Sequence, residues 1–196
     1  GTALGTVAIT AATTTNSSTW VGSSTLGITG HAVINGAISG ITTLTVSGTT
    51  SLGANVTTTA VGGQTYSGAV TITGSAVTLN SSSNNGVVLF SSTVNSAANA
   101  ANPLTVSAGS GNVTFTGVVG GGTNGALGAL TVNSTGATTF SAAVTAASVT
   151  TNAGGTTAIN GGTITTTGAQ TYNDAVTLGA ATTLTSSGSG NINLAS

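Results

Sequence analysis

The sequence is most unusual in what it lacks. It contains no lysine, arginine, glutamate, cysteine or methionine, and apart from two tyrosines its only ionisable side chains are Asp174 and His31. Charged residues make up 1% of the chain, whereas a typical soluble domain has about 25%. These absences exclude most kinds of catalysis and most classes of partner before any motif is considered.

Catalysis and metal binding need residues that this chain does not supply. General acid–base catalysis requires titratable groups near a substrate, a glycosidase requires paired carboxylates, and a zinc site requires three or four His, Cys, Asp or Glu ligands. A Ser-His-Asp triad would have to use His31 and Asp174, which lie far apart in the sequence, and no serine stands in a GxSxG elbow. We therefore expect no catalytic residue, no metal site and no cofactor, and we expect the chain not to be an enzyme.

Charge also limits the partners. Nucleic acids and anionic lipids are bound largely through Lys and Arg, so we expect neither as a partner. The absence of cysteine excludes disulfides, and no stretch approaches 18 consecutive apolar residues, so we expect no transmembrane segment. Because a net charge near zero favours association, the composition is typical of a protein that assembles.

The residues that are abundant form the alternating pattern of short β-strands. Threonine accounts for 44 residues and glycine for 31, while 38% of residues are hydrophobic and the mean hydropathy is +0.44. Triplets such as LTV, VTI, VTL and VTF alternate apolar residues with threonine, which is the pattern of a half-buried strand. Clusters of Gly, Asn and Ser separate them, as expected for turns. The sequence therefore predicts an almost entirely β protein.

Internal repeats indicate how the strands are arranged. LTV segments begin at Leu44, Leu104 and Leu130, each followed by a polar turn and a second short strand. A longer repeat relates residues of about 41–94 to about 154–196. We predict one domain over 1–196, a parallel β-solenoid of about eight rungs at roughly 4.8 Å each, forming a segment or subunit of a longer assembly. The module would be a strand-turn-strand unit of roughly 20–26 residues. The alternative is a β-sandwich subunit with strands exchanged between chains.

The aromatic residues have regular positions. Phe90, Phe115 and Phe140 stand at equal intervals along the sequence, which predicts an aromatic stack on one face of the solenoid. Tyr66 and Tyr172 occupy equivalent positions in GQTYSGAVTI and AQTYNDAVTL, so we expect the same structural role for both.

Three single residues have a structural and a functional interpretation. Trp20 could be a platform for a sugar, but a lone tryptophan more often packs or caps an end. His31, in GITGHAVING, is interpreted as a surface or turn residue. Asp174, in QTYNDAVTL, stands where a turn enters a strand, and we expect its carboxylate to accept hydrogen bonds from nearby backbone N–H groups.

The stretch GGTTAINGGTITTTGAQTYNDAVTLGAATTLTSSGSGNINLAS resembles the long, charge-poor repeats of very large bacterial surface proteins of the filamentous-haemagglutinin or autotransporter-adhesin type. The resemblance is strongest over 154–196 and weaker over 41–94. It implies a right-handed parallel β-solenoid on the bacterial cell surface that serves adhesion, a sheath or a fibre. It transfers no catalytic residue to this chain.

Two functions of different kinds follow. The first is a structural extracellular protein, a cell-surface fibre, sheath or adhesin stalk built by head-to-tail β stacking, because uncapped solenoid ends expose unpaired strand edges. Its partners would be other copies or adjoining repeats of a larger chain, with a surface glycan or a host or abiotic surface beyond them. The alternative is an ice-binding Thr-rich β-solenoid, suggested by the TTT triplets at 13–15, 57–59 and 165–167.

Overall fold

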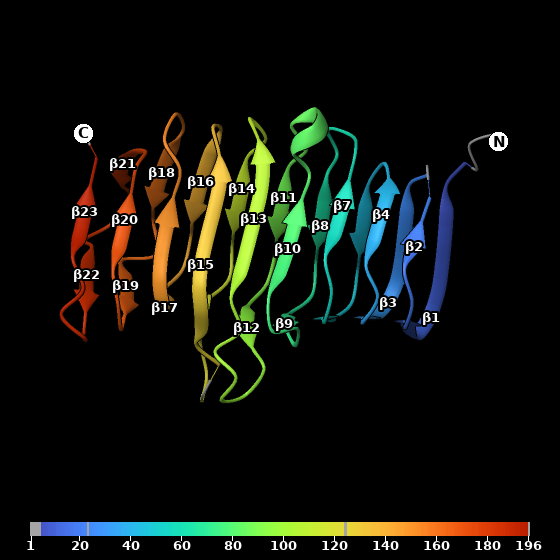
Figure 1. Cartoon of the computed structure of the whole chain (residues 1–196), viewed down its shortest axis with the longest axis horizontal. Coiled ribbons are helices and arrows are strands. Elements are labelled where there is room, and N and C mark those ends of the chain that lie inside the picture. The colour runs from blue at the N-terminus through green and yellow to red at the C-terminus, as the bar shows by residue number, and fades with distance from the viewer. Residues whose placement is uncertain (1–4, 23, 124, 196) are drawn as a thin grey trace.

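The computed structural model describes residues 5–22, 24–123 and 125–195. The chain forms a β-solenoid, a coil whose turns stack from the N-terminal end to the C-terminal end (Figure 1). All pairings between its named strands are parallel. This confirms the predicted parallel solenoid and replaces the alternative of a sandwich with exchanged strands.

Each complete turn contributes to three faces of the coil. Face A consists of β5 (Leu44–Val46), β8 (Gln64–Tyr66), β11 (Val88–Phe90), β14 (Val113–Phe115), β16 (Ala137–Phe140), β18 (Thr156–Ile159) and β21 (Ala175–Leu178). Face B consists of β6 (Thr50–Leu52), β9 (Val70–Ile72), β12 (Val94–Ser96), β19 (Thr163–Thr166) and β22 (Thr183–Ser186). Face C consists of β2 (Trp20–Val21), β4 (Ile38–Ile41), β7 (Val56–Thr58), β10 (Val77–Asn80), β13 (Leu104–Gly109), β15 (Leu127–Ser134), β20 (Gln170–Tyr172) and β23 (Ile192–Leu194).

Four longer strands bend round a corner and belong to two faces. They are β1 (Val7–Asn16) and β3 (Leu26–Ile34), which share faces A and B, β17 (Val144–Thr151), which shares faces B and C, and β15, whose Leu127 pairs with Ala146 on face B. One short 3-10 turn, η1 (Ser82–Asn84), is the only helical segment in the described part of the chain. The path is therefore made almost wholly of strands and corners.

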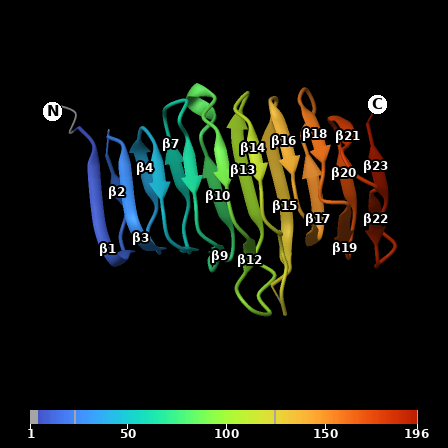
Figure 2. The same cartoon turned by 180° about the vertical axis from the view of Figure 1, so that it is seen from behind.

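The turns differ in length, and there are about nine of them rather than eight. Face A has nine stacked strands from β1 to β21, which span eight spacings, or roughly 38 Å at ~4.8 Å each. A short turn runs from Leu26 to its partner Leu44, and a longer one runs from Phe90 to its partner Phe115. The predicted strand-turn-strand module lacked the third strand of each turn. The loop after β12, at residues 97–103, projects from the coil (Figures 1 and 2).

The core is a set of columns that run along the coil, because alternate residues of most strands point inward. On face A the rings of Tyr66, Phe90, Phe115 and Phe140 stack with centroid distances of 5.3, 4.8 and 5.3 Å. All four side chains are buried. The predicted aromatic stack is therefore confirmed, and Tyr66 belongs to it.

At the corner between faces A and B the backbones of successive turns come very close. A Cβ atom on Gly68 would overlap the carbonyl oxygen of Gly48, and one on Gly48 would overlap that of Gly30. Only glycine leaves room for this approach. The glycines of the sequence therefore do more than end strands, since here they set how tightly the turns stack.

Candidate functional surfaces

His31 and Asp174 lie far apart in the structure. His31 belongs to β3, while the partners of Asp174 belong to β18 and the residue just before it. These strands are six strand spacings apart on face A, which is roughly 29 Å at ~4.8 Å each. The two side chains therefore cannot act on one substrate, and a Ser-His-Asp triad cannot form within the chain.

The two residues also have different environments. His31 is exposed, as predicted, and its Nδ1 atom lies 3.1 Å from the backbone N and 2.8 Å from Oγ1 of Thr49 on the next turn. Asp174 is buried, and its carboxylate accepts hydrogen bonds from the backbone N–H of Gly155 at 2.8 Å and the hydroxyl of Thr157 at 3.1 Å. We expected Asp174 to bond within its own turn, but it ties one turn to the previous one.

No group of three or more His, Cys, Asp or Glu residues gathers anywhere in the described ranges. Within those ranges, no helix is long and apolar enough to cross a membrane. The expectation that the chain is not an enzyme stays a prediction. What the fold offers instead are buried polar modules, a column of surface threonines and the two ends of the coil.

Each of the two QTY segments forms the same buried module. Gln64 Nε2 donates to the carbonyl oxygens of Val56 and Asn80 at 3.1 and 3.2 Å, and Tyr66 Oη donates to Gln64 Oε1 at 2.8 Å. The glutamine thus bridges two neighbouring strands of face C from inside the coil. The buried carboxamide thus has a partner for its nitrogen and for its oxygen.

The second module repeats these contacts on a different pair of faces. Gln170 Nε2 donates to the carbonyl oxygens of Ile164 and Thr185 at 3.2 and 2.8 Å, and Tyr172 Oη donates to Gln170 Oε1 at 3.0 Å. However, Gln170 stands on face C and bridges strands of face B, whereas Gln64 stands on face A. The predicted equivalence is right for the hydrogen bonds and wrong for the position.

The position decides the neighbours of each ring. Tyr66 stacks on Phe90, while Tyr172 lies between Thr151 and Leu194 in its column. Burial raises the pKa of both phenols well above the ordinary value of about 10. Both tyrosines are therefore structural groups that stay neutral in the folded protein.

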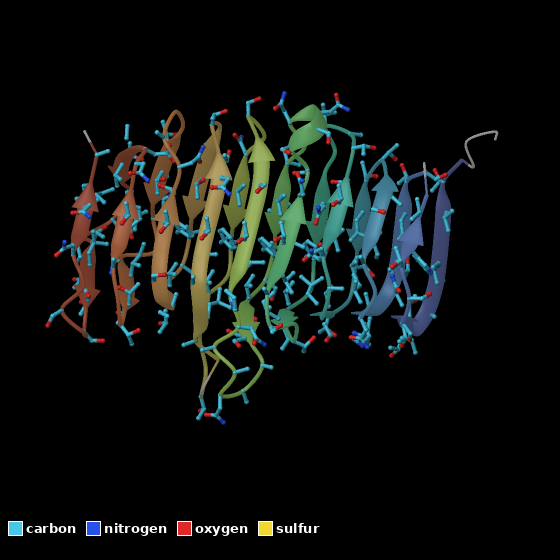
Figure 3. All side chains as sticks on the ribbon, in the orientation of Figure 1. Carbon is cyan, nitrogen blue, oxygen red and sulfur yellow. The ribbon has the colours of Figure 1, made fainter. Side chains whose placement is uncertain are left out.

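Face C carries one uninterrupted column of outward threonines. Strand pairing places five of them on consecutive turns: Thr78, Thr105, Thr131, Thr150 and Thr171. Their hydroxyl groups make no hydrogen bond to another described protein group. Side chains on this surface are short (Figure 3), so the column is open to solvent along roughly 19 Å, four spacings of ~4.8 Å.

The other outward columns are broken. On face A, Leu89 interrupts the run between Thr65 and Thr114, and on face B the partner of Thr71 is Asn95. The TTT triplets do not coincide with the column on face C, because 13–15 and 165–167 lie on or beside face B, and 57–59 lie on face C outside the column. The sequence triplets were therefore the wrong indicator of a Thr array.

The last turn of the coil is open at its outer side. Leu178 is 60% exposed and Leu194 is 54% exposed, although both stand in inward columns. Among the residues that the structure describes, the strands β21, β22 and β23 each pair on one side only. This turn therefore offers both unpaired strand edges and uncovered apolar side chains.

The first described turn likewise leaves apolar side chains partly uncovered. Val7 is 39% exposed, and Ile9 and Trp20 are partly buried against the core. Beside Trp20 is a pocket of about 230 Å³, lined mainly by apolar side chains that include Val7, Val21, Leu26 and Ile41. Trp20 thus packs at the end of the core, as its structural interpretation predicted.

Comparison of the chain with protein-family models, with curated proteins and with solved structures found no match. The functional argument therefore rests on the geometry of the coil.

Proposed function

We propose that this chain is a structural element of a bacterial cell-surface fibre, sheath or adhesin stalk, in which the coil is lengthened by further turns stacked on its ends. The observation that carries the proposal is the open last turn, where Leu178 and Leu194 remain exposed in columns that are buried elsewhere. A further turn would cover these side chains and pair the strand edges. It could come from adjoining repeats of a longer chain or from another copy placed head to tail.

The composition supports the same role. Without Lys, Arg or Glu there is almost no charge to hold copies apart, and no site for a protease that cuts after basic residues. The resemblance of 154–196 to repeats of filamentous-haemagglutinin and autotransporter-adhesin proteins supports an extracellular location. The proposal gives the chain no catalytic role, cofactor or metal.

Electron microscopy of the purified chain, with light scattering over a range of concentrations, tests whether copies stack. We expect rods longer than the roughly 38 Å that the stacked strands of one coil span at ~4.8 Å per spacing. The double variant Leu178→Asp/Leu194→Asp should shorten them, because it places charges on the end surface. The matched control is Val61→Asp, at a valine that is 71% exposed but lies outside the inward columns. Monodisperse single coils at every concentration would contradict stacking of separate copies.

A second candidate function, ice binding, is favoured by the five-threonine column of face C. Its strands are pinned by buried neighbours on both sides of each threonine, such as Leu130 and Val132 around Thr131. The column therefore presents water with methyl and hydroxyl groups at one fixed spacing on an uncharged surface.

Thermal hysteresis and the shape of growing ice crystals test this second function. Thr131→Tyr should abolish both effects, since a bulky side chain in mid-column breaks the array. Thr139→Tyr is the matched control, because Thr139 is an outward threonine of comparable exposure on β16, in the interrupted run of face A. A wild-type chain that leaves ice growth unchanged would eliminate this function.

A further inference from the structure

The ends of the coil can be compared column by column, because strand pairing carries each position from one turn to the next. On face A the inward columns begin at Val7 and Ile9 and end at Val176 and Leu178, respectively. Each inward column of face A thus has an apolar residue at both ends. The outward column between them begins at Ala8 and ends at Thr177.

Faces B and C can be followed in the same way. On face B an inward column begins at Thr14 and ends at Leu184, and the outward column beside it begins at Thr15 and ends at Thr185. On face C the column that begins at Trp20 ends at Leu194. The exposed Leu194 at one end therefore corresponds to the apolar pocket beside Trp20 at the other.

We infer that the end surface binds a second copy of this chain in one register, with β21 and β22 paired to the two halves of β1 and β23 paired to β2. This places Leu178 on Ile9, Leu184 on Thr14 and Leu194 on Trp20. The inference rests on the proposed stacking function and specifies its interface. It continues the parallel turn-on-turn contact that already recurs along the coil, so the two copies share one axis and one strand direction.

The charges of the two ends allow this contact. The only charged side chain of the chain, Asp174, is buried and bound within the coil, so neither end carries a side-chain charge that the interface would have to desolvate. The unpaired backbone groups of β21, β22 and β23 meet those of β1 and β2. Because a head-to-tail contact of this kind does not close, it produces a linear polymer.

Pairs of engineered cysteines test the register, since the chain has no cysteine of its own. Ala8, Thr15, Thr177 and Thr185 are all exposed and outward. In the inferred register, Ala8 faces Thr177 and Thr15 faces Thr185 across the junction. Adjacent strands lie within the distance that a disulfide spans. Ala8→Cys/Thr177→Cys and Thr15→Cys/Thr185→Cys should therefore form disulfide-linked ladders on mild oxidation.

The crossed pairs are the matched controls. Ala8→Cys/Thr185→Cys and Thr15→Cys/Thr177→Cys place the same residues on different faces, and we expect at least tenfold less cross-linked chain. Equal cross-linking of matched and crossed pairs, or dimers of a single Thr177→Cys variant, would overturn the register while leaving stacking intact. Absence of both cross-links and rods would overturn the register together with the proposed stacking.

Discussion

Phe115 and Leu178 stand in the same inward column of face A, three turns apart, and differ in exposure. Phe115 is 1% exposed between Phe90 and Phe140, whereas Leu178 is 60% exposed above Ile159. The exposures differ because Phe115 is covered by a turn on each side, whereas Leu178 is covered by a turn on one side only. In a coil of this kind each turn is stabilised by its nearest neighbours, so central turns and the last turn should respond differently to equivalent changes.

The largest difference is expected for truncation in this column. Phe115→Ala should lower the free energy of unfolding by about 3–5 kcal/mol, because it removes a buried ring from the middle of the stack. Leu178→Ala should cost less than about 0.5 kcal/mol, as is usual for an exposed side chain. Urea denaturation followed by circular dichroism measures both, and similar losses would show that the last turn is covered in solution.

Alkaline pH should separate the two tyrosines. Their pKa values are raised in the folded state, so the stability they contribute is complete below the unfolded-state pKa of about 10 and is lost as pH rises above it. At pH 11 ionisation of each phenol in the unfolded state should lower the stability of the region that buries it by about 1.4 kcal/mol. For Tyr66 this should reduce the free energy of global unfolding, whereas for Tyr172 it should promote opening of the last turn. Hydrogen exchange across pH 9–11 tests this, with Tyr66→Phe and Tyr172→Phe as variants that lose the respective dependence.

The two glutamines should likewise differ, with Gln64 affecting global stability and Gln170 affecting the last turn. Gln64→Leu removes the hydrogen bonds to the carbonyl oxygens of Val56 and Asn80 and leaves the buried hydroxyl of Tyr66 without its acceptor, at an expected cost of about 1–3 kcal/mol in global stability. Gln170→Leu frees the carbonyl of Thr185 on β22, and its effect should appear as faster amide exchange in β22 and β23. Uniform exchange along the coil in both variants would mean that the turns unfold together.

The smallest effect expected is an increase in stability. The hydroxyl of Thr138 is buried without a hydrogen-bond partner in the described structure, so Thr138→Val should raise the free energy of unfolding by about 1 kcal/mol. Thr177→Val, at an exposed position of the last turn, should leave it nearly unchanged. Thermal melts compare the two, and a destabilising Thr138→Val would indicate that the hydroxyl is bonded in solution.

The sequence predicted those features that follow from the regular spacing of one residue type along the chain. Alternation of apolar residues with threonine indicated strands, and the even spacing of Phe90, Phe115 and Phe140 indicated the aromatic stack, because residues one turn apart share a column. The scarcity of ionisable residues left His31 and Asp174 as the only candidates for a catalytic triad, and the structure places them far apart. These inferences needed no knowledge of where the corners lie.

Other features could not be predicted because they depend on which residues of each turn fall on which face of the coil. The third strand of each turn is short and its loops vary, so the turn length changes along the coil and does not appear as one period. The threonine column of face C joins residues from differently spaced segments, and only strand pairing aligns Thr131 with Thr150. The burial of Asp174 follows from a contact with Gly155 one turn away, which no local motif encodes.

The two glutamine–tyrosine modules also show that one short sequence can occupy different faces of the coil. The segments match in sequence, but one begins on face A and the other on face C, so the distance between them is not a whole number of turns. Each glutamine nevertheless bonds to one strand before it and one strand after it in the sequence. The module therefore needs the neighbouring strands of its own stretch of chain and not a particular face of the coil.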